Sequence, residues 1–201
     1  MKKVILASKS PRRIELFKRY GIIADSIPAE VDESIPAEIC DPCEIVKYLA
    51  HKKARHIADS ASDDVIVVGS DTLVFCGDKI LGKPDNKDDA RNMMKLLSDN
   101  THSVISGICI ICNDKCICES IRTEVVFKAL TSEEIEGYIS TFEPYDKAGG
   151  YGIQSLAGAF VKEIHGDYYN VVGLPISRLI EILKTDFGYD ALSNLFNKGE
   201  V

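Results

Sequence analysis

The chain has 201 residues, of which 45% are hydrophobic and 27% are charged, and its formal net charge is −7. A chain of this size and composition forms one globular domain or two closely joined lobes, and its longest apolar runs have the length of strands, not of membrane spans. An acidic chain lacks the basic field expected of a general nucleic-acid binder, although a local group of cations remains compatible with a small anionic ligand. The first residues hold no signal-peptide pattern, so we expect a cytoplasmic protein.

The first predicted strand, at residues 3–7, runs straight into the sequence Ser-Lys-Ser-Pro-Arg-Arg. Ser10 has the residue type of a helix N-cap, whose hydroxyl accepts from an amide of the first turn, and Pro11 suits the first helical position. The positive end of this helix favours an anion, and Arg12 and Arg13 add two cations whose fork geometry matches phosphate oxygens. A capped surface helix with two solvated arginines is the alternative interpretation.

The rest of the chain continues with strands and helices. In order, we expect a strand at 22–27, a helix at 43–61, a β-branched run at 65–75 interrupted by Gly-Ser-Asp-Thr, a helix at 87–98, strands at 102–112 and 116–128, a helix from 131, a strand at 159–165 and a helix at 175–184. Alternating strands and helices followed by a hairpin of long strands predict an α/β fold with a mixed sheet. Such sheets bind ligands at strand ends, which is where the charged loops fall.

Asp71 is an aspartate inside an otherwise apolar strand. A buried carboxylate is costly without a partner, so the position indicates a metal ligand, a general base, or a carboxylate bonded to backbone amides at a bulge. Glu33, in the acidic loop at 28–42, together with Asp71 would suit Mg²⁺ or Mn²⁺, which prefer carboxylates and substrate phosphates. Lys53, and Lys83 between its glycine and proline, are candidate phosphate ligands or ordinary surface charges.

The segment from Glu143 to Gln154 is a polar loop rich in glycine. Its glycines permit close approach of the backbone to a ligand, and Gln154 offers both a donor and an acceptor to a base edge. A surface loop with glycines for its turns is the alternative. The chain contains no Gly-x-Ser-x-Gly, Walker A or Rossmann pattern, which argues against a serine hydrolase, a P-loop enzyme and a dinucleotide enzyme.

The chain has seven cysteines, and in an intracellular chain free thiols are expected. Cys40 and Cys43, like Cys109 and Cys112, have zinc-ligand spacing. Cys109 and Cys112 lie in a predicted strand, where residues three apart point to opposite faces, so these two cannot bind one ion without a turn. A hairpin turn after Cys112 would bring it near Cys116. A structural zinc site is therefore the less favoured interpretation.

Six segments together resemble, in the same order, the Maf family of nucleoside triphosphate pyrophosphatases. They are residues 6–13, 69–72, 82–84, 102–104, 143–154 and 170–175. The resemblance implies a mixed, elongated sheet flanked by helices, with two lobes around a central cleft, as in Maf and ITPase-like folds. It also implies a homodimer. We expect one domain over 1–184, and we expect residues 185–201, which match no motif of the family, to form a C-terminal tail or helix.

The activity that the resemblance implies is hydrolysis of a nucleoside triphosphate to its monophosphate and pyrophosphate. The sequences Asp-Lys-Ala-Gly and Tyr-Gly-Ile-Gln are similar to those of the subgroup that acts on dTTP, UTP and some modified pyrimidines. By that resemblance Asp71 is the general base, and Arg12, Thr72 and Gln154 select the base. Ser155 differs from the glycine that is usual there.

Two other functions remain open. One is a nucleotide-sensing regulator of cell division and septum formation with little turnover. The other is a 7-methyl-GTP pyrophosphatase, against which Lys147 and Gln154 weigh.

The leading hypothesis is attack of water on the α-phosphate, with a divalent metal shared by Asp71 and Glu33. Cations and backbone amides would neutralise the phosphates. The expected phosphate-binding residues are Ser8, Arg12, Arg13, Lys53 and Lys83. We expect Arg13, Lys83 and Asp71 to converge on one crevice, and the partner to be a nucleoside triphosphate, not a nucleic acid or a membrane.

Overall fold

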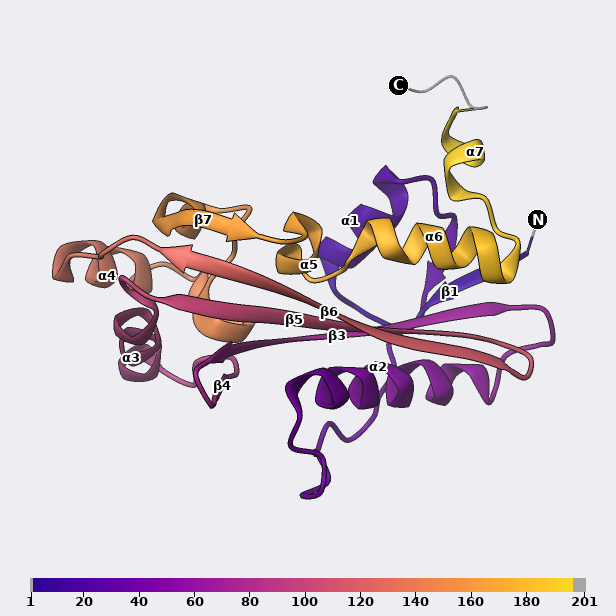
Figure 1. Ribbon diagram of the computed structural model, residues 1–201, viewed down its shortest axis with the longest axis horizontal. Coiled ribbons are helices and arrows are strands. Elements are labelled where there is room, and N and C mark those ends of the chain that lie inside the picture. The colour runs from indigo at the N-terminus through magenta and orange to yellow at the C-terminus, as the bar shows by residue number, and fades with distance from the viewer. Residues whose placement is uncertain (1, 197–201) are drawn as a thin grey trace. The chain divides into compact units, whose positions relative to one another are not determined.

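The computed structural model describes residues 2–196. Within these residues the backbone forms two compact units, the first made of 2–71, 106–121 and 173–196, and the second of 72–105 and 122–172. The strands are β1 (Val4–Leu6), β2 (Ala24–Ser26), β3 (Ile66–Cys76), β4 (Lys79–Leu81), β5 (Thr101–Cys112), β6 (Lys115–Phe127) and β7 (Val161–His165). They form a mixed seven-stranded sheet in the order β2-β1-β3-β5-β6-β7, with β4 paired to β3 (Figure 1). The predicted fold class, a mixed sheet flanked by helices, is confirmed.

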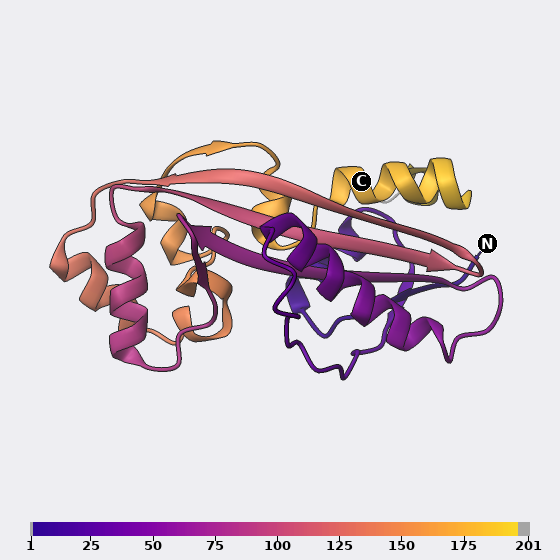
Figure 2. The ribbon, with the colours of Figure 1, turned by 60° about the horizontal axis from the view of Figure 1, so that its bottom comes forward.

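The first unit contains the parallel part of the sheet, in which β1 pairs with both β2 and β3. Its helices are α1 (Pro11–Arg19), α2 (Pro42–Ala58), α6 (Ile176–Phe187) and α7 (Ala191–Phe196). The views show α2 on one face of the sheet and α1 and α6 on the other (Figures 1 and 2). Covering on both faces explains why all three residues of β1 are buried and apolar.

Two glycines allow α2 to pack directly on the sheet. A Cβ atom on Gly69 of β3 would lie 2.2 Å from the carbonyl oxygen of Ala50, and one on Gly107 of β5 would lie 2.1 Å from that of Val46. Since no side chain fits at either position, the backbone of α2 contacts both strands closely. This contact fixes which residues of α2 face which strand positions.

The second unit has a separate apolar core, with Met94, Phe127 and Tyr138 among its buried side chains. Its helices and turns are α3 (Lys87–Leu97), α4 (Ser132–Ile139), α5 (Tyr168–Val172) and the 3₁₀ turns Pro144–Asp146, Ala148–Gly150 and Leu156–Phe160. The predicted starts of α3 and α4 are confirmed, because Asn86 caps α3 and a capping box opens α4.

Three features differ from the sequence-based expectation. The strand β3 is continuous through Gly-Ser-Asp-Thr, because small residues fit beneath α2 and the aspartate has a charged partner. The short helix α5 was not predicted. The segment set apart at 185–201 contains the end of α6 and all of α7, and residues 197–201 lie outside the described part of the chain.

Among the helices of residues 2–196, none combines the length and the apolar character needed to cross a membrane.

Candidate active site

The candidate site of the first unit lies where β1 ends and β3 continues. Leu6, the last residue of β1, pairs with Val68, and the Ala7 amide donates to the Val68 carbonyl at 2.8 Å. The chain then leaves the sheet, so Ser70 and Asp71 lie beyond the end of β1. In the sheet, β1 lies between β2 and β3, and β5 lies on the far side of β3. The chain therefore continues from β1 to β2 on one side and from β3 toward β5 on the other, and α/β sheets bind ligands at the carboxyl ends of strands where the order diverges in this way.

Arg13 connects α1 to this point of the sheet. Its Nε donates to the Gly173 carbonyl at 2.9 Å and its Nη1 to the Ser70 carbonyl at 2.8 Å. Burial lowers the pKa of Arg13, the neighbouring Arg12 lowers it further, and the charges of Asp71 and Glu33 raise it. A guanidinium remains protonated in such surroundings. Arg13 therefore brings a permanent cation to the site and also holds the local backbone together.

Lys53, from α2, joins the two acidic residues of the predicted metal site. Its Nζ lies 2.5 Å from Asp71 Oδ1 and 2.7 Å from Glu33 Oε1. The side chains of Lys53 and Asp71 are 12% and 10% exposed, whereas that of Glu33 is 60% exposed. The ion pair is the partner that a carboxylate inside a strand requires. The carboxylate of Asp71 bonds to the ammonium of Lys53, which differs from the alternative in which it would bond to backbone amides.

The N-terminus of α1 differs from the expectation in one respect. Ser10 occupies the N-cap position, but its side chain makes no capping hydrogen bond. Instead the hydroxyl of Ser8 accepts from the Ser10 amide at 3.2 Å. Pro11 is the first helical residue, and the first turn contains no acidic residue. The positive end of α1 and the side chain of Arg12 therefore leave this region favourable for an anion.

Asp71 and Glu33 suit a hard divalent cation. Lys53 bonds one oxygen of each carboxylate, Oδ1 of Asp71 and Oε1 of Glu33, so the second oxygen of each is the one it would offer to an ion. Mg²⁺ and Mn²⁺ take oxygen ligands and usually combine one or two carboxylates with substrate phosphates. The donor set therefore fits the predicted metal.

Three predicted site residues lie in the second unit or at its first residue. Thr72 is half-buried and directly follows Asp71 on β3, while Lys83 and Gln154 are exposed. The Gly82 carbonyl accepts from the Gly149 amide at 2.9 Å, so the segment with Lys83 is bonded to the glycine-rich loop. The convergence of Lys83 with Arg13 and Asp71 stays a prediction.

The loop that carries Gln154 is organised by Glu143, whose role the sequence did not reveal. The carboxylate accepts from Tyr138 Oη at 3.1 Å, from Ser155 Oγ at 2.5 Å and from the Leu156 amide at 3.2 Å. Ser155, the departure from the family pattern, thus makes a defined bond beside Gln154. The partners of Glu143 lie 5 residues before it and 12 and 13 residues after it in the sequence, and such separations produce no periodic pattern that could predict the contacts.

Two of the motifs stabilise the second unit. His102 is buried, lies 2.7 Å from Tyr151 Oη through its Nε2, and has its pKa lowered to about 4 by burial. Asn170 Nδ2 donates to the Val104 carbonyl at 2.9 Å and to Thr123 Oγ1 at 3.0 Å. The contacts of His102 and Asn170 are with residues outside the candidate site, so we assign both side chains a structural role.

Comparison with known proteins supplies the classification. A family model described as "Maf-like protein" matches residues 3–186. The dTTP/UTP pyrophosphatase of Bacillus anthracis is 51% identical over 184 residues, which cover 92% of this chain and 95% of that protein. The protein of the same name from Bacillus cereus (strain ATCC 10987 / NRS 248) is also 51% identical, with 92% and 90% covered. A HAM1 protein from Coxiella burnetii shares the fold, with a TM-score of 0.52, 12% identity and coverage of 92% and 99%. This chain belongs to the Maf family.

Proposed function

We propose that this protein hydrolyses dTTP and UTP to the monophosphate and pyrophosphate. The observation that carries the proposal is the group of Arg12, Arg13 and Lys53 with Asp71 and Glu33 at the carboxyl end of β1. Cations beside a pair of carboxylates suit a triphosphate and its counter-ion. Relatives that are half identical over most of this chain have the name dTTP/UTP pyrophosphatase, which supports the choice of substrate.

In the proposed reaction a water oxygen attacks the α-phosphorus. The bond from that phosphorus to the bridging oxygen of the β-phosphate breaks, and pyrophosphate leaves. Asp71 accepts the proton of the water, and Lys53, which is bonded to it, fixes the position of the carboxylate. Phosphoryl chemistry of this type depends mainly on placed charge, which Arg12, Lys83 and the amides at the start of α1 supply.

Asp71 and Glu33 are the residues that would hold Mg²⁺ or Mn²⁺. When bound, such an ion neutralises phosphate charge and acts as a Lewis acid. Arg13 keeps β3 and α1 in place around these residues through its bonds to two carbonyls.

Base selection belongs in this proposal to Arg12, Thr72 and Gln154. The amide of Gln154 presents both a donor and an acceptor, which a pyrimidine edge requires. The bond between Ser155 and Glu143 limits the freedom of the segment that carries it. The proposal extends to a cytoplasmic location and a homodimer, which rest on the sequence and the resemblance.

The direct test is pyrophosphate release from dTTP, UTP and 7-methyl-GTP in the presence of Mg²⁺ or Mn²⁺. We expect turnover of the two pyrimidine nucleotides, and we expect Asp71→Asn to lower kcat by about 100-fold or more, as loss of a general base does. Asp59→Asn is the control, because Asp59 is an exposed acid in the same unit. Circular dichroism of both variants checks the fold.

Three results would contradict the proposal. Near-normal turnover by Asp71→Asn would remove Asp71 from the mechanism. Tight binding of dTTP without pyrophosphate release would identify a nucleotide sensor. Faster hydrolysis of 7-methyl-GTP would place the chain in the purine subgroup.

A further inference from the structure

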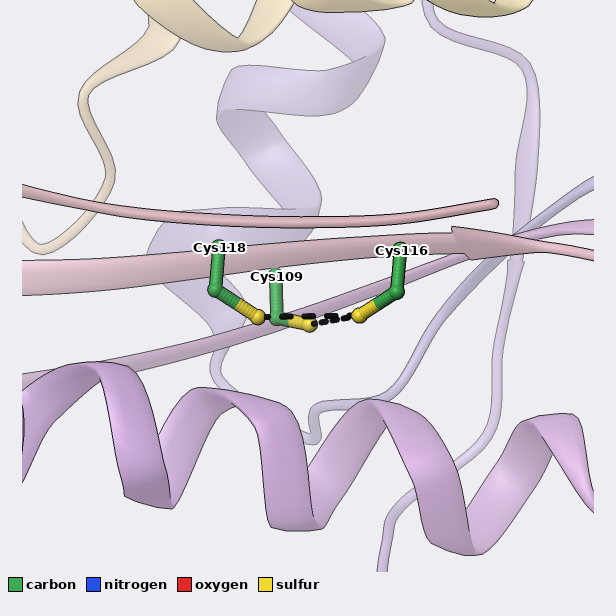
Figure 3. A group of neighbouring side chains, drawn as sticks. All are labelled: Cys109, Cys116 and Cys118. Atoms are coloured by element: carbon green, nitrogen blue, oxygen red, sulfur yellow. Dashed lines mark hydrogen bonds between the residues drawn. The ribbon is translucent and has the colours of Figure 1, made fainter. Parts of the chain in front are cut away.

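Three thiols form a cluster that the proposed reaction does not use. They belong to Cys109 on β5 and to Cys116 and Cys118 on β6 (Figure 3). Their sulfur atoms all lie within 4.8 Å of one another, and within residues 2–196 no other group of three or more metal-ligating side chains is this close. All three cysteines are free thiols.

The distances match those of a metal-thiolate centre. Cys109 Sγ lies 3.6 Å from Cys116 Sγ, and Cys116 Sγ lies 3.8 Å from Cys118 Sγ. A zinc ion binds thiolate sulfur at about 2.3 Å, so two sulfur ligands of a tetrahedral ion lie about 3.8 Å apart. The sulfur atoms therefore have the spacing of ligands around one ion.

The β5–β6 hairpin produces this arrangement. Cys116 and Cys118 are two residues apart on β6 and point to the same face. That face is the one covered by α2, because Gly107, two residues before Cys109 on β5, contacts α2 directly. Figure 3 shows the three side chains directed toward α2. The expectation of an approach between Cys112 and Cys116 selected the wrong pair, because the two-residue turn places Lys115 opposite Cys112 and turns Cys116 to the other face.

One side of the cluster is buried, and the other is accessible to solvent. Cys109 is buried in the apolar core beneath α2, and Cys116 is exposed. Cys118 lines a surface pocket of about 500 Å³ together with Lys47 and His51. An ion could reach the thiols through this pocket, and water could occupy a remaining ligand position.

Two cations of α2, Lys47 and Arg55, act on the thiols at the solvent side of the cluster. Contact with Cys118 and burial raise the pKa of Cys109, and burial raises that of Cys116, so the proposal rests on the spacing of the three sulfur atoms and not on their ionisation in the metal-free protein. Three thiolates with a divalent ion carry one net negative charge, which Lys47 and Arg55 offset in part, since each also pairs with an acid, Glu44 at 2.5 Å and Asp59 at 3.8 Å.

We propose that Cys109, Cys116 and Cys118 bind one thiophilic d¹⁰ cation, Zn²⁺ or Cu⁺, through three thiolates, with a further position open to water or an added ligand. Thiolate ligands select these ions. Binding replaces three S–H bonds by metal–sulfur bonds and releases the protons to solvent. The site differs in chemistry from Asp71 and Glu33, whose oxygen ligands suit Mg²⁺ or Mn²⁺.

The test uses the full chain, reduced and freed of metal with a chelator. Titration with Co²⁺ is expected to give a sulfur-to-cobalt charge-transfer band and tetrahedral d–d bands that saturate at one ion per chain. Zn²⁺ should displace the cobalt at one equivalent. Elemental analysis of protein purified without added metal, and anaerobic titration with Cu⁺, distinguish the two ions.

Two variants locate the site. Cys116→Ser and Cys118→Ser should each lower the affinity by about 100-fold or more, since even loss of a group that only orients a ligand costs about 10- to 100-fold. Cys112→Ser is the matched control, because it lies on the same hairpin outside the cluster and should keep the full band. Urea unfolding of each variant confirms that it folds.

Absence of the charge-transfer band would overturn the proposal, and so would octahedral cobalt spectra or an unchanged affinity in folded Cys116→Ser. A disulfide among the three cysteines in freshly purified, metal-free protein would also overturn it, because the cluster would then be a redox pair.

Discussion

At the scale of single residues, Arg13 contributes to the site in two ways: it donates hydrogen bonds to backbone carbonyls, and its charge interacts with the charges of Asp71 and Glu33. Arg13 donates from Nε to Gly173 and from Nη1 to Ser70. These bonds need the fork of a guanidinium, and the single ammonium of lysine does not reproduce them. The arginine therefore has a structural role in addition to its charge.

We expect Arg13→Lys to lower the free energy of unfolding by about 1.5–3 kcal/mol, the usual contribution of a hydrogen bond from a charged group. Urea denaturation measures this loss. Arg19→Lys is the control, because Arg19 and its partner Glu15 are exposed, and such a pair contributes about 1 kcal/mol or less. Equal effects of the two substitutions would contradict the structural role of Arg13.

His102 gives a second expectation at this scale. Burial lowers its pKa from 6.5 to about 4, so between these pH values the unfolded chain binds a proton that the folded chain does not. Stability from this group is therefore complete above pH 6.5 and is lost as the pH falls, by roughly 3 kcal/mol in all.

Urea midpoints measured from pH 7.5 to pH 4.5 test the titration of His102. His102→Gln should flatten the pH dependence in this range, because glutamine does not titrate. The exposed His165 provides the control, and His165→Gln should leave the slope as it is in the original protein. A slope that is the same in both variants would show that other groups dominate.

At the scale of elements, α2 is the part of the first unit that serves both sites. It supplies Lys53 to Asp71, and its other turns lie over the thiols of the hairpin. Its position depends on Gly69 and Gly107, where the helix backbone approaches the strands too closely for any side chain.

We expect Gly69→Ala to destabilise the fold by about 1–3 kcal/mol, the usual cost of overpacking, and to slow pyrophosphate release because Lys53 moves away from Asp71. Thermal unfolding and the pyrophosphate assay measure the two effects. Gly137→Ala is the control, since a Cβ there meets nothing within 4 Å and alanine favours the helix by up to about 1 kcal/mol. An intact Gly69→Ala protein with full activity would contradict this view of α2.

The elements show how far local sequence rules reach. The caps of α3 and α4 are side chains within a few residues of the backbone they bind, and the helix starts expected from the sequence, at 87 and 131, agree with them. Ser10 is also a residue type that favours the N-cap position, but its side chain makes no capping bond, and the hydroxyl of Ser8 accepts from the Ser10 amide instead. The thiol cluster depends on strand register, which one residue in the turn changes completely.

At the scale of the whole molecule, three strands belong to both units. Because β3, β5 and β6 are continuous through them, neither unit can unfold without losing strands of the other. We therefore expect one cooperative thermal transition.

A ligand that binds only the folded chain should shift this transition. With an α,β-imido analogue of dTTP and Mg²⁺ at 100 times the Kd, the stabilisation is about 2.7 kcal/mol, which raises the Tm by about 5–10 °C in a chain of this size. Arg12→Ala should reduce the shift, whereas Arg19→Ala, on the exposed side of α1, should retain it. Equal shifts of the Tm in both variants would show that Arg12 does not contribute to nucleotide binding.

The sequence predicted the fold class and the family because the six motifs occur in order along most of the chain. It also selected Asp71, Glu33 and Lys53, which the structure brings together. It did not reveal the acceptors of Arg13 or the partners of Glu143. Those are long-range bonds to backbone and loop atoms, which no local pattern of residue types encodes.

Because β1 ends at Leu6, opposite Val68, the longer strand β3 extends beyond it. The pairing of β3 with β1 ends at Val68 and its pairing with β4 begins at Val74, and a stretch of strand edge without a partner strand is a template for pairing with a foreign chain. The guanidinium of Arg13 donates a hydrogen bond to the carbonyl of Ser70 in this stretch of β3. A side chain thereby occupies the acceptor that the amide of a further strand would use, so we expect the arginine at this position also to disfavour pairing of a foreign segment there.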